Sequence, residues 1–303
     1  MYDLLIIGSG PAGMTAGIYA KRANLKVAIF EKEAPGGQLV NYKEIENYTG
    51  YKKLDGFQLA LNMFNHVQDI GVEVIFDEVL NVELDGNVKR VITKNDTYET
   101  KAVIVATGNV PRRLGVEGEE ELASNGISWC AICDGPIYKD RKVVVVGGGN
   151  SAVEEASYLA TLASHVTIVQ NLDYLTADHK AQVILRKADN VDYHFGSLVK
   201  KFLKDEKGLK GVVITNKEGK EIEIEADGVF EYVGMNPVTD MVKDLGITTE
   251  YGYITANERM ETEVPGIYAA GDVIDKQIRQ VVTAAADGAI AAQNVLRYLE
   301  TWE

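Results

Sequence analysis

The two cysteines of this chain lie three residues apart, in the segment Trp129-Cys130-Ala131-Ile132-Cys133-Asp134. Two thiols at this spacing can close a small disulfide ring, and Asp134 can hold the proton that a thiol loses or regains during exchange. A structural pair and a zinc site are the alternatives. Zinc usually takes about four ligands, but the chain has no second cysteine pair and its histidines are scattered. The motif therefore predicts a redox function and no bound metal.

Length and composition indicate a soluble enzyme of about two domains. The 303 residues include neither a secretory signal pattern nor an apolar run of the roughly 18 residues needed to cross a bilayer, so we expect a cytoplasmic protein. In that compartment a cycling disulfide is more usual than a persistent one. The formal net charge of -14 argues against binding to nucleic acid or to an anionic membrane, because both attract positive charge.

A dinucleotide-binding pattern stands at the start of the chain. The apolar run 4–7 is typical of a buried strand, and it leads into Gly8-Ser9-Gly10-Pro11-Ala12-Gly13 and a helical pattern over 14–23. Gly8 permits the tight turn, Gly10 lets the backbone approach a pyrophosphate, and Gly13 lets helix and strand pack closely. A second predicted strand over 26–30 ends at Glu31, whose carboxylate can accept hydrogen bonds from a ribose.

The same pattern returns in the middle of the chain. A strand pattern over 142–146 leads into Gly147-Gly148-Gly149-Asn150-Ser151-Ala152, a predicted helix over 153–162 and a strand over 166–169. We therefore predict an α/β fold with two Rossmann-like, three-layer dinucleotide-binding domains. Near the C-terminus another apolar strand closes on Gly271-Asp272. The carboxylate of Asp272 could reach the ribityl or phosphate region of a flavin, and an ordinary strand-terminating turn is the alternative.

Together these motifs resemble the low-molecular-weight thioredoxin reductase family over essentially the whole chain. The matching segments are Gly8 to Gly13, Gly36-Gly37-Gln38-Leu39, Glu46-Asn47, Ala106-Thr107-Gly108, Cys130 to Asp134, Gly147 to Ala152, Gly271-Asp272 and Arg279-Gln280-Val281. The resemblance implies a discontinuous FAD-binding domain, residues 1–110 and 234–303. A central domain, residues 111–233, would be inserted in it and carry the two cysteines. A homodimer, FAD as cofactor and thioredoxin as protein substrate are also implied.

The resemblance further implies roles for individual residues. Cys133 would receive reducing equivalents from the flavin, Cys130 would attack the disulfide of the partner, and Asp134 would act as acid and base. Exchange needs one accessible sulfur and a second that resolves the mixed disulfide, which agrees with this division. The residues implied to hold FAD are Gly8, Gly10, Pro11, Ala12, Gly13, Glu31, Gly37, Gln38, Asn47, Ala106, Thr107, Gly108, Gly271, Asp272, Arg279, Gln280 and Val281.

The chain departs from the family just after the second glycine turn. Members that use NADPH carry His-Arg-Arg at the end of this strand and another Arg soon after it, which hold the 2′-phosphate. Here residues 169–176 read Val-Gln-Asn-Leu-Asp-Tyr-Leu-Thr, without a cation. Each lost charge-assisted contact is worth about 1.5–3 kcal/mol, so we expect weak NADPH binding. The segment favours reduced ferredoxin, the donor of the ferredoxin-dependent flavin thioredoxin reductase branch.

Charge opposes that choice of donor, because ferredoxins are typically acidic and the chain is too. Docking would need clustered basic residues, for which the candidates are Arg112-Arg113, Lys139 with Arg141-Lys142, and Lys200-Lys201 through Lys204, Lys207 and Lys210. An NADPH- or NADH-dependent thioredoxin reductase is therefore the alternative. A reductase of another redox protein and a non-catalytic flavoprotein redox sensor also remain, although a sensor needs no proton relay.

Overall fold

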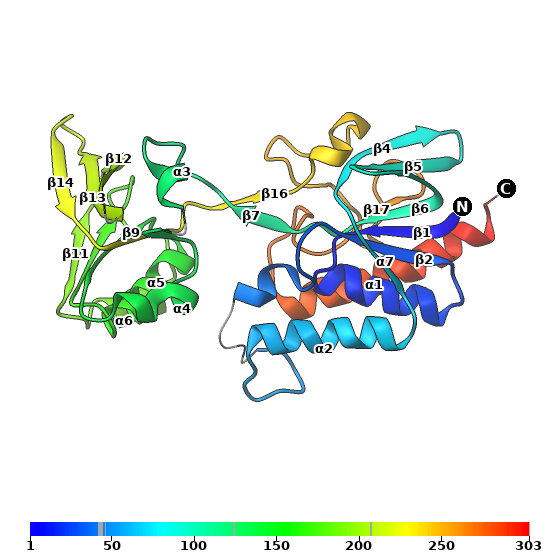
Figure 1. Ribbon diagram of the computed structural model, residues 1–303, viewed down its shortest axis with the longest axis horizontal. Helices are drawn as coiled ribbons and strands as arrows, with labels where there is room; N and C mark the ends of the chain where they lie inside the picture. The colour runs from blue at the N-terminus through cyan, green and yellow to red at the C-terminus, as the bar shows by residue number, and fades with distance from the viewer. Residues whose placement is uncertain (42–44, 46, 124, 207, 303) are drawn as a thin grey trace. The chain divides into compact units, whose positions relative to one another are not determined.

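The computed structural model describes residues 1–41, 45, 47–123, 125–206 and 208–302 (Figure 1). The chain divides into two compact units. The terminal unit comprises Met1–Val110 and Asn236–Glu303, and the central unit comprises Pro111–Met235. The chain crosses between them twice, at strands β7 (Asn109–Pro111) and β16 (Met235–Pro237), which pair with each other. No helix in the described part of the chain is long and apolar enough to cross a membrane.

The terminal unit is built, in its described residues, on a seven-stranded sheet. The strand order is β3-β2-β1-β6-β5-β4, and β17 pairs with β6. Strands β1, β2, β3, β6 and β17 are parallel, whereas β4 and β5 continue the sheet in antiparallel fashion. The strands are β1 (Tyr2–Ile7), β2 (Val27–Glu31), β3 (Glu73–Phe76), β4 (Val79–Asp85), β5 (Val88–Thr93), β6 (Thr97–Val105) and β17 (Ile267–Ala269).

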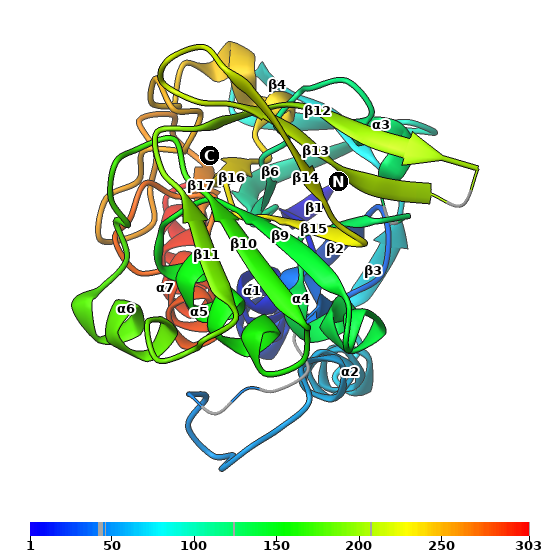
Figure 2. The ribbon, with the colours of Figure 1, turned by 90° about the vertical axis from the view of Figure 1, so that its left-hand side faces the viewer.

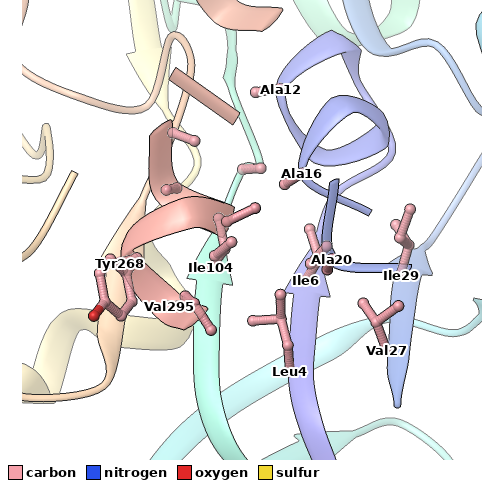
Figure 3. Packing of buried hydrophobic residues seen from close by; sticks show 14 of the residues in the cluster. Leu4, Ile6, Ala12, Ala16, Ala20, Val27, Ile29, Ile104, Tyr268 and Val295 are labelled. Carbon is pink, nitrogen blue, oxygen red and sulfur yellow. The ribbon is translucent and has the colours of Figure 1, made fainter. Parts of the chain in front are cut away.

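Both faces of this sheet are covered by apolar side chains. Leu4 and Ile6 pack on α1 (Pro11–Arg22) and α7 (Val281–Glu300) (Figure 3). Their neighbours in β1, Leu5 and Ile7, belong to a second cluster with residues of η3 (Asp240–Leu245) on the opposite face. The remaining helices of the unit are α2 (Gly56–Asp69) and the short η1 (Gly37–Asn41).

The central unit contains a five-stranded parallel sheet in the order β11-β10-β9-β15-β8 and a three-stranded antiparallel sheet in the order β12-β13-β14 (Figure 2). These strands are β8 (Ile127–Ser128), β9 (Lys142–Val146), β10 (His165–Val169), β11 (Val191–His194), β12 (Leu198–Asp205), β13 (Gly208–Thr215), β14 (Glu221–Glu225) and β15 (Gly228–Glu231). Its helices are α3 (Glu119–Leu122), α4 (Ala131–Asp134), η2 (Gly135–Tyr138), α5 (Asn150–Ala160) and α6 (His179–Leu185).

Successive side chains of β9 point to opposite faces of the parallel sheet. Both faces are covered, so the central unit has three layers. Val143 and Val145 face the helical side and cluster with Leu159 of α5. Val144 and Val146 face the antiparallel sheet and cluster with its apolar side chains. The predicted α/β class with Rossmann-like layers is thus confirmed. Helices α1 and α5 begin three residues earlier than the sequence pattern indicates, because the last residues of each glycine turn already form the first helical turn.

Candidate active site

The cysteine motif follows β8 and forms the one-turn helix α4 in the central unit. Cys130 is disulfide-bonded and partly exposed. Cys133 lies within α4, but its side chain is outside the described residues. The position of the Cys133 sulfur and the separate roles of Cys133 and Cys130 in disulfide exchange therefore stay predictions.

Three consecutive backbone amides at the start of α4 have oxygen acceptors. The Cys130 N–H donates to Ser128 Oγ at 3.1 Å, and the Ala131 N–H donates to the Tyr232 hydroxyl at 2.9 Å. The Ile132 N–H donates to the carboxyl group of Glu155, which lies on α5. Acceptors from β8, from the segment after β15 and from α5 thus fix the backbone of the motif.

Asp134 is held in the same turn. The Ser128 hydroxyl donates to Asp134 Oδ2 at 2.6 Å, and Ser128 Oγ also accepts the Cys130 N–H. Asp134 is partly exposed, so its carboxylate can exchange protons with water. This arrangement agrees with an acid and base role for Asp134, which stays a prediction.

Glu155 is a site residue that sequence reasoning missed. Its Oε2 is shielded from solvent and has no hydrogen-bond partner among the described residues. Burial, and then the Glu154 carboxylate, raise the pKa of Glu155 to about 7. Helical spacing could have located it, because position 155 shares a face with the buried Ala152 and Leu159.

We expect Glu155→Gln to flatten the pH dependence of stability. The folded state keeps a proton on Glu155 up to about pH 7, whereas the ordinary pKa is 4.5, so the wild type loses stability as pH rises from about 4.5 to 7. Glutamine still accepts the Ile132 N–H, and it should gain about 1–3 kcal/mol relative to the wild type across this range. Urea unfolding at pH 5 and pH 8 measures the difference. Glu218→Gln, at an exposed position in the loop between β13 and β14, is the control and should keep the wild-type slope.

The first glycine turn joins β1 to α1 in the terminal unit. Gly8 has a φ of +103°, and a Cβ there would lie 2.5 Å from the Ala106 carbonyl oxygen. A Cβ at Gly13 would overlap with the Gly8 carbonyl, so the fold itself requires both glycines. Gly10 differs, since a Cβ there would meet nothing within 4 Å. The turn therefore leaves open space at the position where a pyrophosphate is expected to approach.

Segments far apart in the sequence meet at this turn. A Cβ on Gly37 would lie 3.5 Å from Gly10 Cα, and one on Gly271 would lie 2.9 Å from Ala12 Cβ. Glu31 accepts hydrogen bonds from the backbone and hydroxyl of Ser9 at 3.1 and 2.6 Å. The other predicted FAD residues also lie in this unit. Pro11 and Val281 are the first residues of α1 and α7. The rest form hydrogen bonds within the unit: Gln38 with the Asn109 carbonyl, Thr107 and Gly108 with the backbone of Val238, Asn47 with Gln280, and Arg279 with the Asp272 carbonyl.

Asp272 follows the sheet edge at β17. Its Oδ1 is buried and accepts no hydrogen bond from the described residues, and the nearest cation, Lys276 Nζ, lies 3.9 Å away. Burial raises the pKa of the Asp272 carboxyl group. A buried acceptor without a donor costs free energy, so it fits a ligand that brings hydroxyl groups to this position.

The second glycine turn joins β9 to α5 in the central unit. Gly147 has a φ of +126°, and a Cβ there would overlap with the Tyr232 carbonyl. The Gly148 carbonyl accepts the backbone N–H groups of Thr176 and Ala177, and a Cβ on Gly148 would lie 2.5 Å from Gln170 Nε2. The segment after β10 therefore wraps the turn. Gly149 is the N-cap of α5 and supplies no side-chain cap.

A cation that the sequence pattern did not indicate lies beside this segment. Lys217, from the loop between β13 and β14, forms an ion pair with Asp173. Asn150 at the start of α5 also exchanges two hydrogen bonds with Asp178. The segment after β10 contains no Lys or Arg of its own, but folding brings one to it.

Comparison with known proteins shows which family the chain belongs to. A model of the pyridine nucleotide-disulphide oxidoreductase family matches residues 2–288. The thioredoxin reductase of Bacillus subtilis is 45% identical over 303 residues, covering 99% of this chain and 95% of that protein. The crystal structure of Lactococcus lactis thioredoxin reductase covers 99% of both chains at 42% identity, with a TM-score of 0.91. The chain belongs to the low-molecular-weight thioredoxin reductase family.

A ferredoxin-flavin thioredoxin reductase from Clostridium acetobutylicum is a more distant structural neighbour. The two chains are 31% identical, the alignment covers 99% of this chain and 98% of the Clostridium acetobutylicum chain, and the TM-score is 0.55. The comparisons thus support the family without singling out its ferredoxin-dependent branch.

Proteins of this family are FAD-dependent oxidoreductases, and this chain is a flavoprotein of that kind. The terminal unit fits the cofactor on two observations. Open space lies at Gly10, at the N-terminus of α1, where backbone N–H groups can meet a pyrophosphate. The buried, unpartnered Oδ1 of Asp272 can accept a ligand hydroxyl.

Proposed function

We propose that this chain reduces the disulfide of thioredoxin with the dithiol of Cys130 and Cys133. We further propose that a pyridine nucleotide bound at the second glycine turn is the electron donor. The observation that carries the first proposal is the motif itself, a disulfide-bonded and partly exposed Cys130 whose backbone is fixed beside the partly exposed Asp134. The name shared by the relatives supports the choice of thioredoxin.

The chemistry balances as two successive disulfide exchanges. FAD, when held by the terminal unit, would supply the two electrons that convert the Cys130–Cys133 disulfide into a dithiol. The Cys130 thiolate then attacks one sulfur of the thioredoxin disulfide and displaces the other as a thiolate, which takes a proton. Cys133 attacks the resulting mixed disulfide, re-forms the Cys130–Cys133 bond and releases thioredoxin with two thiols. Asp134 would hold the transferred proton between these steps.

Charge pairing supports a pyridine nucleotide over ferredoxin. Lysines of the predicted docking stretches are neutralised by acids from other elements, in the pairs Lys142–Glu225, Lys200–Glu221 and Lys204–Glu121. Lys207 lies outside the described residues. A paired stretch presents a weak positive field to an acidic protein. Lys217, beside the segment after β10, is likewise paired with Asp173, so support for the nucleotide comes from the matched pyridine nucleotide-disulphide oxidoreductase family and from the retained glycine turn.

Ferredoxin is the second candidate donor, because residues 169–178 contain no Lys or Arg. Anaerobic bleaching of the flavin absorption band with NADPH, NADH and reduced ferredoxin in turn separates the donors. Rapid bleaching by a nucleotide at micromolar concentration supports the proposal. Bleaching by ferredoxin alone would overturn it and restore the ferredoxin-dependent interpretation.

Gly149→Asp is expected to block the nucleotide while leaving the fold intact. Gly149 has ordinary N-cap dihedral angles, φ −82° and ψ −178°, so aspartate can cap α5 there. Its negative charge would repel the nucleotide phosphates, and kcat/KM for the nucleotide should fall at least about tenfold. Gly149→Asn caps the helix without charge and should be much less affected. Equal activity of both variants with a nucleotide would contradict binding at this turn.

We also infer a homodimer, as the family resemblance implies, and a cytoplasmic location, as the sequence pattern predicts. Light scattering of the purified holoprotein measures the mass, and a monomeric mass at micromolar concentration would contradict the inference.

A further inference from the structure

Glu231 is a buried carboxyl group next to the cysteine motif. It is the last residue of β15 and is 2% exposed. Its Oε2 accepts the indole N–H of Trp129, the residue before Cys130, at 2.9 Å. Its other oxygen, Oε1, is buried and accepts no hydrogen bond from the described residues. The Glu231 carboxyl group also forms a hydrogen bond with the carboxyl group of Glu119, itself 2% exposed.

Two carboxyl groups can form a hydrogen bond only if one of them carries a proton. Glu119 accepts the backbone N–H groups of three residues, Leu114 at 3.0 Å, Gly115 at 2.6 Å and Val116 at 3.3 Å. Both oxygens of Glu119 thus already accept backbone N–H groups, whereas Oε1 of Glu231 accepts none from the described residues. The shared proton therefore belongs on Glu231. Burial, and then the Glu119 charge, raise the pKa of Glu231 to about 8.

The charged groups around this pair connect it to the cysteine motif. The Arg113 guanidinium lies over the Trp129 ring, 3.6 Å from its centroid, and it is the cation that acts on Glu231. Tyr232, the residue after Glu231, accepts the Ala131 N–H with its hydroxyl oxygen. The end of β15 thus holds the residues on both sides of Cys130.

We propose that Glu231 is a positioning residue for the dithiol, because the proton it shares with Glu119 fixes the Trp129 indole and the backbone that carries Cys130. Loss of the proton places two carboxylates in contact in a buried site. Glu119 is fixed by its three amides, so Glu231 must turn away toward Arg113 and displace Trp129. The accessibility of Cys130 then changes with the protonation of a residue that does not touch the substrate. This inference rests on the proposed function only for its effect on thioredoxin reduction.

Trp129 fluorescence tests the proposal independently of activity. The chain has two tryptophans, so Trp302→Phe leaves Trp129 as the only indole. We expect its fluorescence to change with a midpoint near pH 8, and Glu231→Gln to abolish the change because an amide can donate to Glu119 and accept from Trp129 at every pH. Glu223→Gln, on the exposed side of β14, is the matched control and should keep the transition. The same transition in the Glu231→Gln protein would overturn the proposal.

Thiol reactivity supplies the second measurement. In the chemically reduced holoprotein, the rate at which a small disulfide reagent reacts rises with pH in every variant because the thiolate is the nucleophile. The wild type should show a further change near pH 8, and the pH profile of Glu231→Gln should lack it. Glu231→Leu leaves the indole N–H without a partner and should lower kcat/KM for thioredoxin about tenfold. Glu231→Gln should keep most of the wild-type kcat/KM at pH 7. Reagent pH profiles of the same shape in the wild type and in Glu231→Gln would contradict the proposal. If thioredoxin is not reduced by any form of the protein, the proposed function fails, while the fluorescence and reagent measurements still decide the role of Glu231.

Discussion

Cys130→Ser is expected to abolish thioredoxin reduction while the purified protein keeps its flavin. The serine hydroxyl does not form a nucleophile comparable to a thiolate near neutral pH, so exchange with a disulfide should fall at least about a thousandfold. The residues predicted to hold FAD lie in the terminal unit, and Cys130 lies in the central unit, so cofactor content should not change. A thioredoxin-coupled assay and the flavin absorption of the purified protein measure the two properties.

Cys133→Ser is the informative partner of that experiment. It should also stop turnover, but it leaves Cys130 able to attack the thioredoxin disulfide and removes the thiol that would resolve the mixed disulfide. A covalent adduct with thioredoxin should therefore accumulate with Cys133→Ser and not with Cys130→Ser. Mass spectrometry detects the adduct. An adduct formed by the opposite variant would reverse the assigned roles, and normal turnover by either variant would contradict the dithiol mechanism.

Gly10→Asp is expected to yield a folded protein without FAD. Gly10 is the N-cap of α1, with φ −75° and ψ −177°, and a Cβ there meets nothing within 4 Å. The substitution is therefore compatible with the backbone and can cap the helix. Its carboxylate would occupy the space left for the pyrophosphate, so affinity for FAD should fall at least about a hundredfold. Absorption spectra after reconstitution with FAD measure the loss.

Gly10→Asn is the matched control, since it has nearly the same shape without the charge. It should retain more flavin than Gly10→Asp, and circular dichroism should show similar helix content in both variants. Unchanged flavin content in Gly10→Asp would contradict the placement of the cofactor at the first glycine turn. The equivalent substitution at Gly149 should leave FAD bound, so the two variants distinguish the cofactor turn from the donor turn.

The strands and glycine turns were predictable because their signals are local. Four apolar residues before Gly8 and four before Gly147 indicate buried strands, and the positive φ values at both glycines explain why no other residue type suits these positions. The meeting of Gly37 and Gly271 with the first turn was expected only through the family resemblance. It depends on packing between distant segments, which periodicity does not encode.

Two of the buried acids could not be located from the sequence. Glu119 belongs to the acidic run 117–121, which is typical of solvated surface, and Glu231 interrupts an apolar strand pattern. The burial of both depends on strands and helices from elsewhere in the chain. The same reason limits charge patterns. The lysine run around Lys200 suggested a basic docking surface, but Glu121 and Glu221 neutralise two of its members in the folded chain. The preference for ferredoxin depended on the absence of cations from residues 169–176, and Lys217 reaches this segment only through folding.

Single-turnover reduction tests the central claim most directly. The holoprotein is reduced anaerobically, freed of donor and mixed with one equivalent of oxidised thioredoxin. We predict that reduction exposes two alkylatable thiols per chain, at Cys130 and Cys133, and that these thiols disappear as thioredoxin gains two. If the reduced holoprotein shows no new thiols, or if thioredoxin stays oxidised while the thiols persist, electrons do not reach thioredoxin through this dithiol.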